Sequence, residues 1–229
     1  MTFDAGPSRD CGACARLAAF RAANRAQFPD WWNGPVPSFG AADARLLVVG
    51  LAPGLRGANR TGRPFTGDYA GDLLFETLIR YGFASGPYDR RPDDGLRLID
   101  CAIVNAVRCV PPENKPTPKE ISACRSYLSA SIGALGGLKV VLALGRVAHE
   151  TVLRAMGKRL AQFPFAHGAR HALGPDGLVL FDSYHCSRYN TNTGVLTEAM
   201  FRDVFASIRV ELDALEGPGR PRTTSARPL

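Results

Sequence analysis

Three separated stretches of the sequence carry polar side chains that can do chemistry together. Asp68 closes a long loop, Asn105 follows an apolar run, and His185 lies in a small polar segment after another apolar run. A carboxylate can orient a water or stabilise a developing cation, and an amide presents a donor and an acceptor to a planar ligand. Each residue also has a structural alternative: Asp68 as a helix N-cap, Asn105 in a turn, and His185 as a hydrogen-bonded structural histidine. The other three histidines we interpret as structural.

Four of the six cysteines form two pairs with informative spacing. Cys11 and Cys14 make a Cys-x-x-Cys pair, and Cys109 and Cys124 make a wider pair that flanks a Pro-Pro loop. Thiolates brought together from loops bind zinc tetrahedrally or hold an iron–sulfur cluster. The spacing does not separate the two metals, and four unrelated buried thiols are the structural alternative.

Apolar runs that alternate with helical segments must position these residues. We expect buried strands near residues 45–49, 98–104, 139–144 and 178–181. Strands that alternate with helices predict a three-layer α/β/α sandwich around a four-stranded parallel sheet. In such a sheet the carboxyl ends of the strands lie along one edge, so the loops after the first, second and fourth strands can converge on one pocket.

The loop after the first expected strand begins Gly50-Leu51-Ala52-Pro53-Gly54 and continues to Asp68. Its first glycines permit a sharp turn and a close approach of a ligand to the backbone. A loop of this length is usually functional or disordered, and its content of Gly, Asn, Phe and Asp favours a shaped pocket. Phe65 is either a core residue or a stacking surface. Phosphate binding of the nucleotide-binding type is the weakest hypothesis, because the P-loop lysine is missing.

Composition limits the class of protein. The chain has 229 residues, of which 45% are hydrophobic, so we expect one domain over 1–216 with a flexible tail over 217–229. The formal net charge of +7 favours a polyanionic partner without establishing one. No apolar run approaches the roughly 18 residues of a membrane span. The first residues have neither the basic nor the apolar part of a signal peptide, so we expect a cytoplasmic protein.

Taken in order, these motifs resemble the uracil-DNA glycosylase superfamily, and most closely its family 5, the type b enzymes. The resemblance rests on residues 50–54, 57–68, Asn105 with 109–112, and 185–194, and it extends from Cys11 to about Phe205. It implies a four-stranded α/β/α sandwich. It also implies a structural [4Fe–4S] cluster, with zinc as the alternative, held by Cys11, Cys14, Cys109 and Cys124.

The resemblance implies a monomeric, monofunctional DNA glycosylase of base excision repair. Such an enzyme flips uracil out of DNA and hydrolyses its N-glycosidic bond, and hypoxanthine, xanthine and ethenocytosine are further candidate substrates. A non-catalytic iron–sulfur protein that binds nucleic acid through a degenerate pocket is the alternative. Leu51 favours that alternative, because other branches of the superfamily carry there a polar residue that positions water.

The resemblance also implies roles for individual residues. The implied catalytic residues are Asp68, which takes over the role lost at Leu51, His185 and Asn59. The implied base contacts are Gly50, Leu51, Ala52, Phe65 and Asn105. The implied DNA contacts are Arg60, Arg63, Ser187, Arg188 and Asn190. Two departures from the family pattern stand out: Cys186 occupies a position where proline is common, and residues 190–193 replace a bulky wedge residue.

Overall fold

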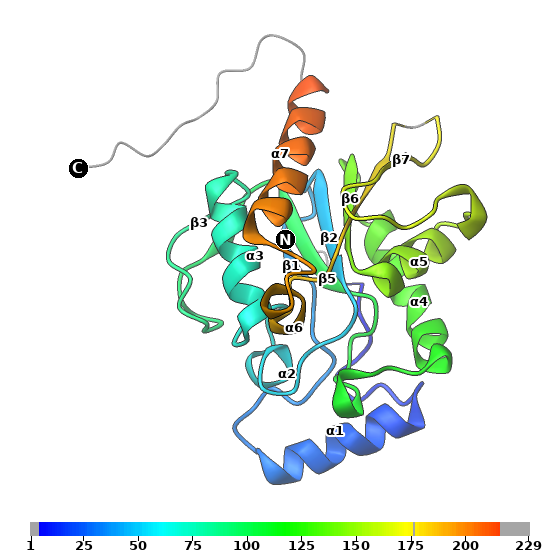
Figure 1. Cartoon of the computed structure of the whole chain (residues 1–229). Coiled ribbons are helices and arrows are strands. Elements are labelled where there is room, and N and C mark those ends of the chain that lie inside the picture. Colours follow the sequence, from blue (N-terminus) through cyan, green and yellow to red (C-terminus); the bar gives the residue numbers. More distant parts are fainter. Residues whose placement is uncertain (1–4, 176, 216–229) are drawn as a thin grey trace.

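A six-stranded sheet with strand order β1-β5-β2-β6-β8-β7 forms the centre of the protein (Figure 1). The computed structural model describes residues 5–175 and 177–215. Four central strands pair in parallel and are buried along their whole length: β2 (Leu46–Gly50), β5 (Cys101–Asn105), β6 (Val140–Leu144) and β8 (Val179–Ser183). Because both faces of these strands are covered, their sequences are almost continuously apolar. The four predicted parallel strands are therefore confirmed as the centre of a larger, mixed sheet.

Two short edge strands extend the predicted sheet. They are β1 (Phe39–Gly40), which pairs antiparallel with β5, and β7 (Arg170–Ala172), which pairs antiparallel with β8. A separate two-stranded ribbon joins β3 (Ala84–Ser85) and β4 (Arg97–Leu98). Segments of two or three residues are too short to show the alternation of side chains that marks a strand in a sequence.

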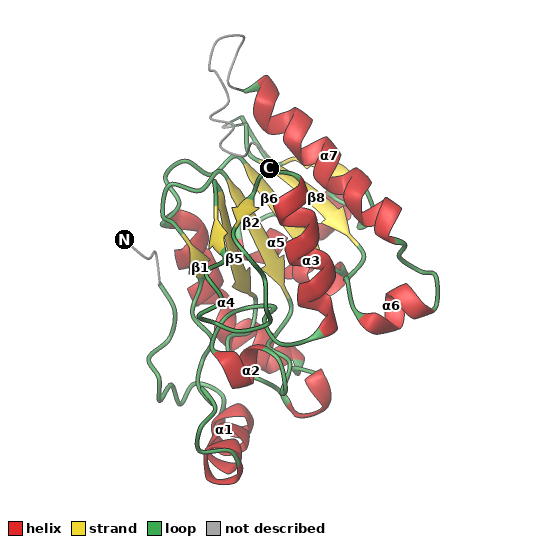
Figure 2. Ribbon diagram, turned by 90° about the vertical axis from the view of Figure 1, so that its left-hand side faces the viewer, coloured by secondary structure: helices red, strands yellow, loops and turns green. Residues whose placement is uncertain are grey.

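Two pairs of helices cover the two faces of the sheet (Figure 2). One face packs against α3 (Tyr69–Arg80) and α7 (Glu198–Ala214), and the other against α4 (Pro118–Gly133) and α5 (Arg146–Ala155). Successive residues of a strand point to opposite faces. Leu46 and Val48 accordingly lie in the first apolar cluster, whereas Leu47 and Val49 lie in the second.

Short elements gather at the carboxyl end of the parallel strands. They include α1 (Ala15–Gln27), α2 (Ala58–Thr61) and α6 (Arg188–Asn192), which lie at the same end of the sheet in Figure 1. Two 3-10 turns, η1 (Pro112–Asn114) and η2 (Leu160–Gln162), complete the described elements. No helix within the described ranges has the length and apolar character that a membrane crossing requires. The expected tail over 217–229 lies outside the described residues.

Candidate active site

A cavity of about 400 Å³ opens where β2, β5 and β8 end. The three expected loops meet there, since the cavity is lined by Leu51, Ala52, Pro53, Gly54, Ala58, Phe65, Asp68, Tyr69, Ala70, Asn105, Asn114, His185, Ser187 and Arg188. In the parallel pairing of β2 with β5, Gly50 lies directly opposite Asn105. This pairing places the end of the first loop beside the start of the second.

Phe65 forms part of the cavity wall in a constrained conformation. Its backbone has a φ of +54°, which is unusual for a bulky residue, and Tyr88 Oη donates a hydrogen bond of 3.2 Å to its carbonyl oxygen. A Cβ atom on Gly50 would lie 2.6 Å from the Phe65 ring and 2.5 Å from Asn105 Oδ1. Only glycine at position 50 therefore lets both side chains approach the strand end this closely.

Asn105 and His185 bring unpaired polar groups to the cavity. The Asn105 side chain is buried and His185 is half-buried, and within the described part of the chain neither side chain has a hydrogen-bond partner. Burial lowers the pKa of His185 to about 4, so the ring is neutral near pH 7 and donates from one nitrogen. Buried polar groups normally have partners. The arrangement therefore suits a planar ligand with both donors and acceptors.

Asp68 is a helix N-cap and also reaches the cavity. It is the N-cap of α3, where its carboxylate accepts a hydrogen bond from Gly71 N at 3.4 Å, and it also lines the cavity. A Cβ atom on Gly54 would lie 2.9 Å from Asp68 Oδ2, and one on Gly57 would collide with the same oxygen. Burial raises the pKa of Asp68 above its ordinary value, although the backbone amides at Gly71 and Ala70 oppose that shift.

Two of the expected site residues are buried away from the cavity. Arg63 is only 5% exposed and forms a buried ion pair with Asp94 at 2.7 Å, so the expected phosphate contact is corrected to a structural role. Asn59 is 1% exposed, does not line the cavity, and donates from Nδ2 to Asn33 Oδ1 at 2.9 Å. Asn59 therefore joins α2 to the segment after α1, while its Oδ1 is buried without a hydrogen-bond partner among the described residues; its expected catalytic role stays a prediction.

Of the expected site residues in and beside α6, two line the cavity and one stabilises the backbone next to it. Ser187 is the N-cap of α6 and lines the cavity together with Arg188, whose guanidinium lies 5.3 Å from the centre of the Tyr69 ring. Asn190 turns inward instead, and its Nδ2 donates to the His185 carbonyl oxygen at 2.8 Å. The amide of Asn190 therefore fixes the backbone that carries His185. Arg60 is exposed on α2 and lies outside the cavity.

The four paired cysteines line one small enclosed space. Cys11 and Cys14 lie at the start of α1, Cys109 follows β5, and Cys124 lies in α4. A tetrahedral zinc site with Zn–S bonds of about 2.3 Å places its sulfur atoms about 3.8 Å apart. Within the described residues, no three of these sulfur atoms lie within 4.8 Å of one another, so the arrangement fits a larger group than a single zinc ion. Buried Arg21 donates to Cys109 Sγ at 3.5 Å.

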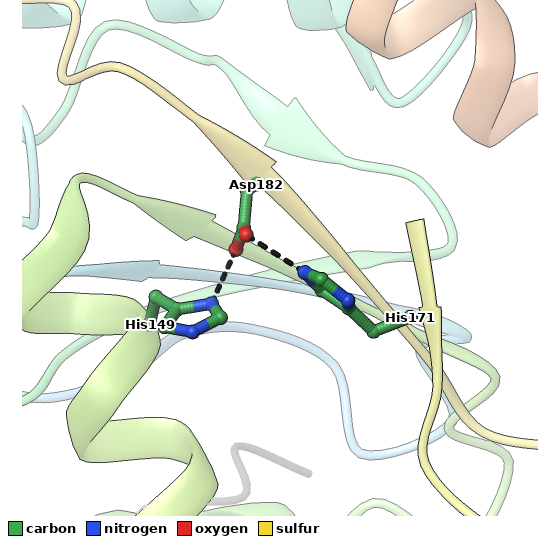
Figure 3. Close-up of side chains that lie close together, drawn as sticks. All are labelled: His149, His171 and Asp182. Carbon is green, nitrogen blue, oxygen red and sulfur yellow. Dashed lines mark hydrogen bonds and ion pairs between the residues drawn. The ribbon is translucent and has the colours of Figure 1, made fainter. Parts of the chain in front are cut away.

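Three residues that the sequence left as structural or did not single out form a separate polar cluster (Figure 3). His149 Nδ1 lies 2.7 Å from Asp182 Oδ1, and His171 Nε2 lies 3.0 Å from Asp182 Oδ2. The second nitrogen of His149 contacts the Phe163 carbonyl oxygen at 2.9 Å. These hydrogen bonds link α5 and β7 to β8, three residues before His185. The chain positions are too far apart for spacing to have revealed the cluster.

Sequence comparison agrees with the fold and the cavity. A family model for the uracil DNA glycosylase superfamily matches residues 37–209. That match covers all four parallel strands and every residue that lines the cavity. The chain belongs to the uracil DNA glycosylase superfamily.

Three relatives that match most of the chain are named as one type within the superfamily. The chain is 46% identical over 199 residues to a type-5 uracil-DNA glycosylase of Thermus thermophilus, a match that covers 85% of this chain and 90% of the relative. It is 38% identical to one of Pyrobaculum aerophilum, with 85% and 86% covered. It is 41% identical to one of Mycobacterium bovis, with 85% and 75% covered.

Proposed function

We propose that this protein is a monofunctional uracil-DNA glycosylase that hydrolyses the N-glycosidic bond of a flipped base. The observation that carries the proposal is the pair of unpartnered groups at Asn105 and His185, which share a cavity with the Asp68 carboxylate. A nucleobase is a planar ligand with alternating donors and acceptors, and it reaches such a cavity only after leaving the base stack. The names of the relatives point to the same reaction.

The proposed base-binding part of the cavity contains Phe65, Asn105 and the turn at Leu51 and Ala52. The Phe65 ring offers a face for stacking, and its centroid lies 6.0 Å from that of His185. The Asn105 amide can donate to one polar atom of uracil and accept from the adjacent N–H. Gly50 would allow this pairing by leaving room for the Asn105 side chain.

Bond cleavage places negative charge on the leaving base and positive charge on the sugar. A neutral His185 would donate a hydrogen bond to the base oxygen where the negative charge collects. A preorganised donor of this kind contributes about 3–4 kcal/mol to the transition state. An ionised Asp68 would stabilise the sugar cation or orient the attacking water. Both groups face one cavity, as this division of roles requires.

We propose that Cys11, Cys14, Cys109 and Cys124 hold a [4Fe–4S] cluster. When bound, the cluster would cross-link α1, the loop after β5 and α4, a structural role. The four thiols line one space, and no three of their sulfur atoms lie within 4.8 Å of one another, which favours this group over zinc. Iron and sulfide analysis of protein purified without air would test the assignment, since a colourless protein with one zinc ion would contradict it.

Arg60, Arg188 and Ser187 are the proposed phosphate contacts. Hypoxanthine, xanthine and ethenocytosine are proposed as additional substrates, because a cavity of about 400 Å³ has room for bases larger than uracil. The alternative, a non-catalytic DNA-binding protein acting through a degenerate pocket, is favoured by the apolar Leu51 on the cavity wall. A panel of oligonucleotides that each contain one damaged base, scored for abasic sites, tests the base range and the alternative together.

A further inference from the structure

A second depression, of about 640 Å³, lies next to the active-site cavity. The short helix α2 separates the two, because Ala58 lines the cavity whereas Arg60 and Thr61 line the second depression. We call this depression the arginine–tryptophan groove. Its wall includes Trp31, Trp32, Arg9, Arg60, Arg90 and Arg91. The two tryptophans are the only ones in the chain.

The two tryptophans have different surroundings. Trp32 is covered on its ring by the Arg9 guanidinium at 4.6 Å, and a Cβ atom on Gly62 would lie 2.8 Å from the same ring system. Trp31 stacks one face on Phe28, with ring centroids 4.0 Å apart and planes at 9°. Trp31 is half-buried and lines the groove, so its remaining surface is the aromatic surface available to a ligand.

Charged groups around the groove favour an anion. Four exposed arginines line it against one aspartate, Asp30. Two of the four are held by carboxylates at the rim, Arg90 by Asp72 at 2.7 Å and Arg91 by Asp93 at 2.8 Å. Each of these guanidinium groups uses Nε and one terminal nitrogen in its ion pair, so donors remain for another ligand.

Arg60 is the least engaged of the four arginines. Within the described residues it has no ion pair and no side-chain hydrogen bond to the protein, whereas Arg9 donates to the Trp32 carbonyl oxygen at 2.9 Å. An exposed arginine without a partner, beside a half-buried aromatic ring with a free surface, is typical of surfaces that bind the backbone and bases of single-stranded nucleic acid.

Backbone hydrogen bonds fix the groove to the active-site helix. Trp32 N donates to the Arg60 carbonyl oxygen at 3.0 Å, and Asn33 N donates to the Asn59 carbonyl oxygen at 3.0 Å. The buried bond from Asn59 Nδ2 to Asn33 Oδ1 adds to this connection. The groove and the cavity therefore keep a fixed separation, which is about the 10 Å width of a helix.

We propose that the arginine–tryptophan groove binds an unpaired nucleotide of the DNA strand and its neighbouring phosphates. The base stacks on Trp31, and Arg60 and Arg91 contact the phosphates. The inference rests on the proposed function for the origin of the strand, but the groove itself can be tested on undamaged DNA.

Binding of an undamaged single-stranded oligothymidylate, followed by fluorescence anisotropy and by tryptophan fluorescence, tests the groove. Stacking of a base on Trp31 should quench the tryptophan emission, and Trp31→Ala should weaken binding about 5- to 150-fold. Trp31→Phe keeps an aromatic face and should bind within about threefold of the unmodified protein. Arg91→Ala should lower the slope of log affinity against log salt by about 0.7.

Arg154→Ala supplies a matched control, because Arg154 is also an exposed arginine paired with a carboxylate, Glu150, on α5. It should leave binding unchanged. The inference is overturned if the oligonucleotide binds without a change in emission and Trp31→Ala keeps full affinity. It is also overturned if Trp31→Ala weakens binding to blunt duplex as much as to single strands, since a paired base cannot stack there. Failure of the proposed glycosylase function would appear separately, as missing abasic sites in uracil-containing DNA.

Discussion

Replacing Asp68 with Asn separates the two roles of this residue. Asparagine is as good an N-cap as aspartate, so the hydrogen bond from Gly71 N to the side chain can persist. The substitution removes only the negative charge. Burial already disfavours the ionised carboxylate, since it raises the pKa of Asp68. We therefore expect the thermal stability of Asp68→Asn to equal or exceed that of the unmodified protein. Asp68→Ala should instead lose about 1 kcal/mol of stability with the cap.

The two variants should behave alike in catalysis. Removing one preorganised charge from the transition state costs about 3–4 kcal/mol, which corresponds to a rate about 10²–10³-fold lower. Single-turnover excision of uracil from an oligonucleotide, with enzyme in excess, measures the step directly. Glu76→Gln is the matched control, because Glu76 is an exposed carboxylate on the same helix that pairs with Arg202. If Asp68→Asn excises uracil within about threefold of the unmodified rate, the carboxylate is only a helix cap.

Four further predictions follow from the same geometry. His185→Ala should lower the excision rate clearly but less than Asp68→Asn, and an unchanged single-turnover rate would remove the imidazole from the reaction. Because burial lowers the pKa of His185 to about 4, the imidazole should stay neutral over the neutral pH range, whereas the rate should fall as the pH drops through the raised pKa of Asp68, which must stay ionised. An inflection near pH 6.5 in the pH–rate profile that is kept in Asp68→Asn would contradict the neutral imidazole. Gly50→Ala places a methyl group 2.5 Å from Asn105 Oδ1. It should reduce the excision rate more than tenfold in single-turnover kinetics and cost about 1–3 kcal/mol of stability in thermal denaturation. An unchanged excision rate would show that the Asn105 amide moves freely. Cys11→Ser should lose iron, measured by chemical analysis and visible absorbance, and a full iron complement would show that Cys11 is not a ligand.

Features set by neighbouring residues were predictable from the sequence. The four parallel strands are almost continuously apolar, and each ends within a few residues of its expected limit. Thr117 is the N-cap of α4 and Pro118 is its first residue, as the local pattern indicates. The meeting of three loops in one cavity follows from the parallel order of the strands.

Features set by distant partners were not predictable. Arg63 is an arginine in a polar loop, and only the fold shows that Asp94, 31 residues away, neutralises it in the interior. Asn59 meets Asn33 across 26 residues. The helix α6 has five residues and no apolar face, so it has no periodic signal. The resemblance implies site roles for Arg63 and Asn59, whereas the burial of both side chains depends on contacts that sequence spacing does not encode.

Release of uracil is the most direct test of the central claim, that a carboxylate and a neutral imidazole act on one flipped base. The measurement is the yield of alkali-labile abasic sites in a duplex with a single uracil, compared between the unmodified protein, Asp68→Asn and His185→Ala. The account predicts complete cleavage by the unmodified protein and a slower reaction in both variants, which remain folded and bind the duplex. Tight binding of the duplex by the unmodified protein without any abasic site would contradict it.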